Sequence, residues 1–208
     1  TYNTAVGHHA GRLVSTGVRN TIIGGLAGDA LTTGSYNLSL GYGALSTDTA
    51  GKFSTALGYG ALNQQNFTSA TNAYNTAVGY VAGEVITTGT ENTLIGALAG
   101  DALTVGNTNV AVGTHALSAD TKGDRNVAIG RAALQSQNFT TSTDSYNTAV
   151  GYGTGESITT GTAQVLIGAL AGDAITDADY NVAVGVGALT ADTLGSRTVA
   201  IGHQALSA

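Results

Sequence analysis

The sequence predicts an all-β protein: a parallel β-roll, or β-solenoid, of twelve rungs of about 17 residues each. Three observations lead to this fold class. An Asn-Thr-Ala-Val-Gly motif recurs in fixed register, the positions around it keep a constant character, and 31 glycines make glycine about twice as frequent as usual. With 10% charged and 42% hydrophobic residues, the chain has the opposite balance to a disordered segment, so we expect it to fold.

The motif defines twelve units, each with an anchor glycine. Successive anchors lie 17, 17, 17 and 21 residues apart, and this pattern repeats. The units therefore fall into groups of four with a super-period of 72 residues: 1–72, 73–144 and the incomplete group 145–208, all within one continuous solenoid. The anchors are Gly7, Gly24, Gly41, Gly58, Gly79, Gly96, Gly113, Gly130, Gly151, Gly168, Gly185 and Gly202.

The residues before each anchor predict a short strand. The position directly before the anchor is aliphatic in every unit, and the position before that is mostly Ala. Neighbouring side chains on a strand face opposite ways, so both faces are apolar and we expect the strand to be covered on both sides. We expect the aliphatic column to be the structural core: Val6, Ile23, Leu40, Leu57, Val78, Ile95, Val112, Ile129, Val150, Ile167, Val184 and Ile201.

Polar and small positions complete the rung. Asn occupies the fourth position before the anchor in nine units, which predicts a stacked amide ladder. The fourth position after the anchor reads Gly, Gly, Leu, Leu in each group, and an aliphatic residue follows three positions later only where it is Gly. We interpret this segment as a second strand whose inward residue shifts between unit types. A recurrent glycine ten residues after the anchor indicates a turn with positive φ.

Composition excludes several classes of function. The net charge of −6 and the scattered seven basic residues argue against binding to nucleic acid or anionic membranes. No apolar run reaches the roughly 20 residues of a membrane span. The absence of Cys removes disulfides and thiolate metal sites, and no motif indicates a cofactor. Because the chain opens at Thr1 and lacks Met, we interpret it as a processed product or an excerpt.

The unit Asn-Thr-Ala-Val-Gly-x-x-Ala-Leu, with variants such as Asn126-Val127-Ala128-Ile129-Gly130, resembles the head repeats of YadA-like trimeric autotransporter adhesins. Similar repeats occur in phage tail-fibre-like proteins. The resemblance covers all twelve units and implies a left-handed parallel β-roll that forms a homotrimer, with the strand facing the threefold axis. The unit here is longer than typical head repeats, and no coiled-coil stalk or membrane anchor lies within these residues.

The fourth unit of the first two groups carries four extra residues, which predicts longer loops. These loops hold the Asn-x-Thr sequons at Asn66 and Asn138, and a third sequon starts at Asn37 in the Asn column. One hypothesis is a glycan displayed every four rungs. The alternative is a plain polar loop packed by Phe67 and Phe139.

Carboxylates recur at one surface column, where Glu84 precedes Asp101 by one rung and Glu156 precedes Asp173. Their spacing fits a weak calcium site or a retaining glycosidase pair, whereas a solvated turn is the default for exposed carboxylates. The four His residues form no metal constellation. The Tyr rows either contact sugars or cover the apolar edges of turns. A Ser/Thr column allows ice binding as a further alternative.

Together these patterns favour a non-catalytic fibre or adhesin segment at the cell surface, outside the cell or on a virion. Its partners are expected to be sister copies, possible end-to-end neighbours, and surface glycans or host-cell receptors. The alternative function is a receptor-binding or glycan-processing segment of a phage tail fibre.

Overall fold

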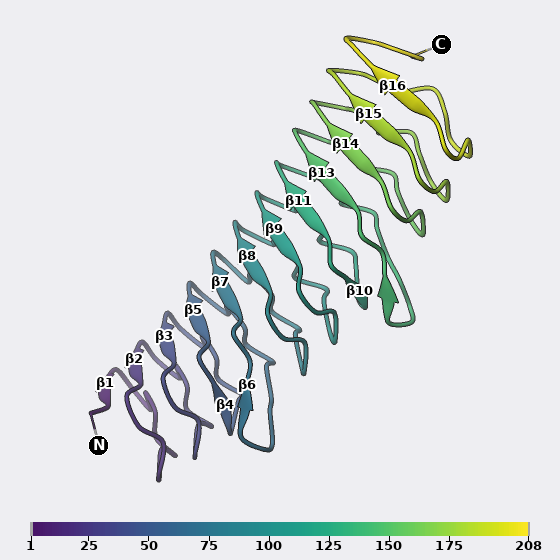
Figure 1. Ribbon diagram of the computed structural model, residues 1–208. Coiled ribbons are helices and arrows are strands. Elements are labelled where there is room, and N and C mark those ends of the chain that lie inside the picture. The colour runs from purple at the N-terminus through teal and green to yellow at the C-terminus, as the bar shows by residue number, and fades with distance from the viewer. Residues whose placement is uncertain (1, 208) are drawn as a thin grey trace.

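A computed structural model describes residues 2–207, and these contain strands and turns but no helix. Twelve three-residue strands form one parallel sheet in which each strand pairs with the next along the chain (Figure 1). The predicted parallel β-solenoid of twelve turns is thereby confirmed. The strands of this sheet are β1 (Thr4–Val6), β2 (Thr21–Ile23), β3 (Leu38–Leu40), β5 (Thr55–Leu57), β7 (Thr76–Val78), β8 (Thr93–Ile95), β9 (Val110–Val112), β11 (Val127–Ile129), β13 (Thr148–Val150), β14 (Val165–Ile167), β15 (Val182–Val184) and β16 (Val199–Ile201).

The strands stay in register across the longer steps as well. Leu57 lies opposite Val78 and Ile129 opposite Val150, although 21 residues separate each pair. The four extra residues therefore loop out, and a small two-stranded sheet lies beside each loop. One pairs β4 (Gly51–Lys52) with β6 (Thr71–Asn72), and the other pairs β10 (Gly123–Asp124) with β12 (Thr143–Asp144).

The rest of each rung is a series of turns, so the prediction of a second strand in every unit is wrong. Residues with left-handed backbone recur in this segment, such as Leu26 (φ 57°) and Leu45 (φ 52°), and a strand cannot contain them. The turns still stack, because their amides bond from rung to rung. Gly28 N–H, for example, donates to the Ala44 carbonyl at 2.9 Å.

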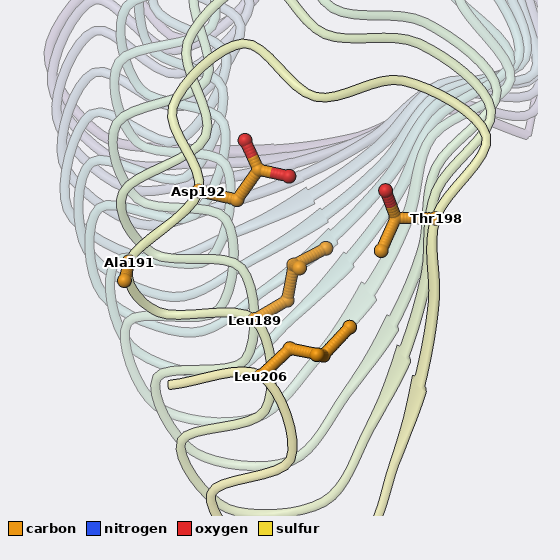
Figure 2. A pocket seen from close by; sticks show the side chains of 5 residues that line it. All are labelled: Leu189, Ala191, Asp192, Thr198 and Leu206. Atoms are coloured by element: carbon orange, nitrogen blue, oxygen red, sulfur yellow. The ribbon is translucent and has the colours of Figure 1, made fainter. Parts of the chain in front are cut away.

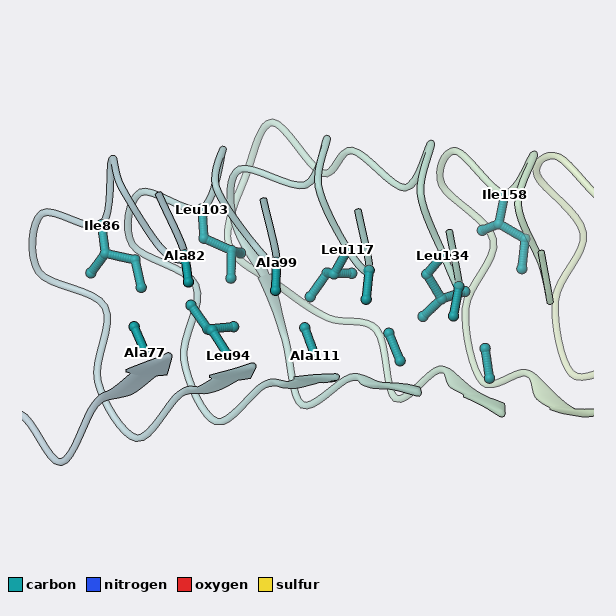
Figure 3. Close-up of a cluster of buried hydrophobic side chains, with 14 of the residues drawn as sticks. Ala77, Ala82, Ile86, Leu94, Ala99, Leu103, Ala111, Leu117, Leu134 and Ile158 are labelled. Atoms are coloured by element: carbon teal, nitrogen blue, oxygen red, sulfur yellow. The ribbon is translucent and has the colours of Figure 1, made fainter. Parts of the chain in front are cut away.

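The core is a narrow lumen between the sheet and the turns. The middle residue of each strand from β2 onward faces inward and is buried, and aliphatic side chains from the turns meet it (Figure 3). The inward residue shifts between rung types as predicted: Leu31 and Ile86 fill the lumen in some rungs, and Leu45 and Leu62 in others. The space is tight, because a Cβ at Gly100 would lie 2.8 Å from the Leu94 side chain.

The aliphatic column predicted as the structural core lies outside the lumen, on the outer face of the sheet. Ile95 is 39% exposed and Ile167 is 42% exposed, and no member of the column is buried. The reason is the width of the lumen, which admits Ala from most strands and leaves the larger side chains on the opposite face. The outward residues are Val6, Ile23, Leu40, Leu57, Val78, Ile95, Val112, Ile129, Val150, Ile167, Val184 and Ile201.

The predicted amide ladder is confirmed. At Asn109 the backbone N–H donates to Asn92 Oδ1 at 3.0 Å, and the side-chain Nδ2 donates to the Gly123 carbonyl at 2.9 Å. The same pair of bonds recurs at Asn20, Asn37 and Asn92. Each buried amide thus joins its own rung to its neighbours on both sides, at the position where the strand begins.

Glycines ten residues after the anchor do not have positive φ, contrary to the prediction. They are needed because backbones approach closely: a Cβ at Gly17 would lie 2.2 Å from the Gly34 oxygen. At the anchor glycines both constraints apply. Gly96 has φ 132°, and a Cβ there would lie 2.7 Å from the carbonyl carbon of Gly113.

We expect Gly96→Ala to lower the free energy of unfolding by about 3 kcal/mol or more, because it combines backbone strain with a backbone clash. Ala163→Gly is the matched control. Ala163 has φ 56°, so the change relieves left-handed strain and should alter stability by less than about 1 kcal/mol. Urea unfolding followed by circular dichroism measures both, and equal effects would contradict this account of the anchor.

Candidate functional site: the outer face of the sheet

The outer face of the twelve-stranded sheet is an exposed surface that runs along all twelve rungs. The first and third residues of each strand point outward, and because the strands are in register these residues form two columns along the rod. The first column is Thr, Val or Leu, and the third is Val, Ile or Leu, so neither column carries a charge. The single chain leaves this apolar strip partly open to solvent.

A row of tyrosines borders the strip just after the anchor glycines. The rings of Tyr42, Tyr59 and Tyr80 stack from rung to rung, with centroids 5.6 and 5.5 Å apart and interplanar angles of 12° and 17°. Each of the three side chains is more than half exposed. The row therefore leaves about half of its ring surface open to solvent beside the strip.

A second row borders the strip just before the Asn ladder. Tyr36, Phe53 and Tyr74 stack with centroids 4.9 and 5.3 Å apart, and the Arg19 guanidinium lies over the Tyr36 ring at 5.3 Å. Arg125 lies over Tyr146 in the same way at 5.7 Å. In the stacked rows the ring faces cover one another, so ring edges and hydroxyls, and not faces, are free for a partner. This geometry disfavours the stacking of sugars on these rings.

The two longer loops project beyond the other turns (Figure 1). Their tips, residues 68–70 and 140–142, are exposed, whereas Phe67 and Phe139 at their bases are each only 6% exposed. Packing of the loops by these two phenylalanines is thus confirmed. In the second loop, exposed Arg125 and Asp144 form an ion pair.

The three sequon asparagines have different environments. Asn37 is 2% exposed and its Nδ2 donates to the Gly51 carbonyl at 2.9 Å, so the folded chain cannot carry a glycan there and that candidate is wrong. Asn138 is exposed, and Asn66 is half-buried with its Oδ1 lacking a hydrogen-bond partner within the described residues. Glycosylation of Asn66 and Asn138 remains a prediction.

A buried polar network near each longer loop was not found from the sequence. Asp48 Oδ1 accepts the backbone N–H of Gly51 and of Phe67, each at 3.0 Å, and Asp48 Oδ2 accepts Gln65 Nε2 at 2.6 Å. Asp120, Gln137 and Phe139 repeat the arrangement. The signal that could have found it is the Asp and Gln in a column that is otherwise aliphatic.

Burial raises the pKa of the Asp48 and Asp120 carboxyls above the ordinary value of 3.8, although hydrogen bonds from Gln65 and Gln137 act in the opposite direction. Burial also raises the pKa of Asp101 and Asp173. These carboxyls bind protons more tightly in the folded chain than in the unfolded chain. Their contribution to stability is therefore fully present below pH 3.8 and is lost as the pH rises through the raised pKa.

We accordingly expect the urea midpoint of unfolding to fall as the pH rises above 3.8. The double variant Asp48→Asn and Asp120→Asn should flatten this dependence, because it removes the two most deeply buried carboxyls. Asp177→Asn is the control, since Asp177 is exposed and its pKa is shifted downward by hydrogen bonds from Thr159 and Thr160. A midpoint that instead rises toward neutral pH in the parent chain would contradict the assignment.

In the surface carboxylate column, two carboxylate oxygens are shielded from solvent. Asp101 Oδ1 and Asp173 Oδ1 are buried without a hydrogen-bond partner among the described residues, and the charge of Glu84 adds to the upward pKa shift of Asp101. Glu156 occupies the position of Glu84 one group later. Within residues 2–207, no group of three or more His, Cys, Asp or Glu side chains is arranged to hold a metal ion.

The Ser/Thr column serves the rungs themselves. Thr32 Oγ1 donates to the Thr49 carbonyl at 3.0 Å, and Thr104 Oγ1 donates to the Thr121 carbonyl at 2.9 Å. Because these donors are used between rungs, the column is not a free hydroxyl array for ice. A shallow pocket lies elsewhere, at the last described rungs, and is lined by Leu189, Asp192 and Leu206 (Figure 2).

Comparison with known proteins gives no match to a family model, a curated protein or a solved structure. The part of the chain described by the structure has no helix of the length and apolar character needed to cross a membrane.

Proposed function

We propose that this chain is a non-catalytic structural and adhesive segment of an extracellular fibre, fibril or surface adhesin. Three parallel copies bury the outer faces of their sheets around a common axis and form a stiff rod. The observation that carries the proposal is the uncharged two-column strip, which extends through all twelve strands of the sheet and is partly exposed in the single chain.

Covering the strip would stabilise the assembly substantially. Full burial of an aliphatic side chain is worth roughly 1.5–3 kcal/mol, and the column of third strand residues supplies one partly exposed side chain from every rung. The first column adds Val or Leu in six rungs and the methyl group of Thr in the others. A second copy presents the same uncharged columns with the same period, so the faces match in both spacing and chemistry.

The rod would present contacts at fixed intervals. The group of four rungs, 72 residues, is its repeating unit, and the longer loops are about 19 Å apart at the usual strand spacing. The loop tips and the exposed edges of the Tyr rows are the surfaces that would contact surface glycans or host-cell receptors. Rods joined end to end would extend the fibre.

The alternative is a receptor-binding or glycan-processing segment of a phage tail fibre. Its sharpest form uses Glu84 with Asp101, or Glu156 with Asp173, as a pair of acids in a cleft between copies. Measured cleavage of a polysaccharide would favour it. A monomeric mass in solution would favour a third function, an ice- or sugar-binding solenoid.

Light scattering coupled to size-exclusion chromatography tests the trimer. We expect a mass of three times the 20.5 kDa chain, and rods on the order of 55–60 Å long in electron micrographs. Val112→Lys with Ile129→Lys should give folded monomers, because both side chains point outward and lysine cannot be buried unpaired. The matched control, Gln64→Lys with Ser136→Lys, changes exposed turn residues and should leave the trimer intact. A parent chain that is monomeric at all concentrations would refute the proposal.

Glycosylation is tested on protein secreted from a host with the modification machinery. We expect intact mass to fall after glycosidase treatment, and Asn66→Gln with Asn138→Gln to abolish the difference. Asn37→Gln should leave the glycan mass unchanged, because Asn37 is buried. An unmodified parent mass would remove the glycan from the proposal.

A further inference from the structure

One column inside the lumen alternates between apolar and polar residues. The seventh residue after each anchor glycine is aliphatic in the first two rungs of each group, and Leu31, Ile86 and Leu103 are fully buried there. In the next two rungs of the first two groups the column holds Asp and then Gln. These side chains, Asp48 with Gln65 and Asp120 with Gln137, are equally buried. The two polar pairs lie 72 residues apart in the sequence.

Each pair belongs to a hydrogen-bonded relay across three successive rungs. Gln65 Nε2 donates to Asp48 Oδ2 in the rung before it at 2.6 Å, and Gln65 Oε1 accepts Nδ2 of Asn75 in the rung after it at 2.9 Å. Gln137 makes the same two bonds, to Asp120 Oδ2 at 2.6 Å and from Asn147 Nδ2 at 2.8 Å. The relays connect the lumen column to the amide ladder.

The relay has a fixed direction. Asp48 only accepts, Gln65 donates toward Asp48 and accepts from Asn75, and Asn75 Nδ2 also donates to the Gly89 carbonyl at 2.7 Å. A Gln amide turned around would place its NH2 group against the NH2 group of Asn75. An aliphatic neighbour would offer neither a donor nor an acceptor. The Asp rung is therefore satisfied only by a following Gln rung.

We infer that the two relays are register locks, which determine which rung stacks on which in a chain of nearly interchangeable rungs. The strands cannot make this choice, because the Ala column, the outward aliphatic column and the Asn ladder are alike in most rungs. If the chain misfolded with the Gln rung looped out, the buried Asp carboxylate would stack against an aliphatic side chain, and this is strongly disfavoured. If the Asp rung stacked instead on the Gln rung of the next group, four rungs further on, the pair would form again. The locks therefore permit a stacking error only by a whole group of four rungs.

Stability alone is a weak reason for such a relay. A buried polar network can often be replaced by apolar side chains without loss of stability, whereas removing one partner is costly. The upward pKa shifts of Asp48 and Asp120 agree with this, since they reflect a lumen that disfavours charge. Asp192, the third Asp of the column, lines the pocket at the last described rungs (Figure 2).

The test converts rungs seven and eight to the aliphatic type with Leu117→Gly, Asp120→Leu, Leu134→Gly and Gln137→Ile. These changes reproduce the Gly and aliphatic pairing of the rungs before them, such as Gly100 with Leu103. Because the chain has no Cys, spin labels can be placed at Thr88→Cys and Thr160→Cys, which flank the altered relay. Labels at Thr16→Cys and Thr88→Cys flank the intact relay and are the internal control. All three threonines are exposed and occupy the same position in rungs four apart, about 19 Å.

Pulsed electron spin resonance should give one distance for both label pairs in the parent chain. In the converted chain we expect the control pair to be unchanged, and the Thr88–Thr160 pair to gain a second distance shorter by about one rung, 4.8 Å. The urea midpoint should fall only modestly, because the amides of Gly123 and Phe139 lose their acceptor while the lumen gains apolar contacts. A single unchanged distance would show that the relay does not set the register. An unfolded or strongly destabilised converted chain would show that the relay acts through stability, and would equally overturn the inference.

Discussion

The narrow lumen is the constraint on which the rest of the structure depends. Adjacent rungs are joined by backbone hydrogen bonds, and at the anchor glycines they approach so closely that a Cβ would lie within 3 Å of the next rung's backbone. A lumen this flat has room for Ala from the strand and about one larger aliphatic side chain per rung. Every rung must solve the same packing problem, and it does so either with Gly and a later aliphatic residue or with Leu and a later polar one.

The same constraint produces the apolar outer face. Since the lumen accepts only small residues from most strands, the large β-branched residues that favour a strand are placed on the opposite side. Ile22, Leu94 and Leu166 are the exceptions, and they occur where the facing turn has Gly. The surface proposed for association of three copies is thus a consequence of how one copy packs its interior.

Polar groups inside the solenoid pair specific positions of neighbouring rungs. The Asn ladder closes the gap where strand and turn meet, and each amide satisfies backbone groups of two rungs. Asp48 and Asp120 do the same for the longer loops, where an N–H of Phe67 or Phe139 would otherwise be buried without an acceptor. These groups show that the repeats are similar in outline but differ in the partners they require.

The sequence by itself determined the repeat, the strand position and the amide ladder, because spacing and column chemistry report period and alternation directly. It could not determine which face of the strand points inward. The alternation of side chains along a strand indicates only that Ala and Val lie on opposite faces. The width of the lumen decides which of the two faces points inward. Nor could it separate the two reasons for a recurrent glycine: left-handed backbone at Gly96, but close approach of another rung at Gly17. Only the tertiary structure brought Asp48, Gln65 and Asn75 together, because residues 27 positions apart in the chain meet when three rungs stack.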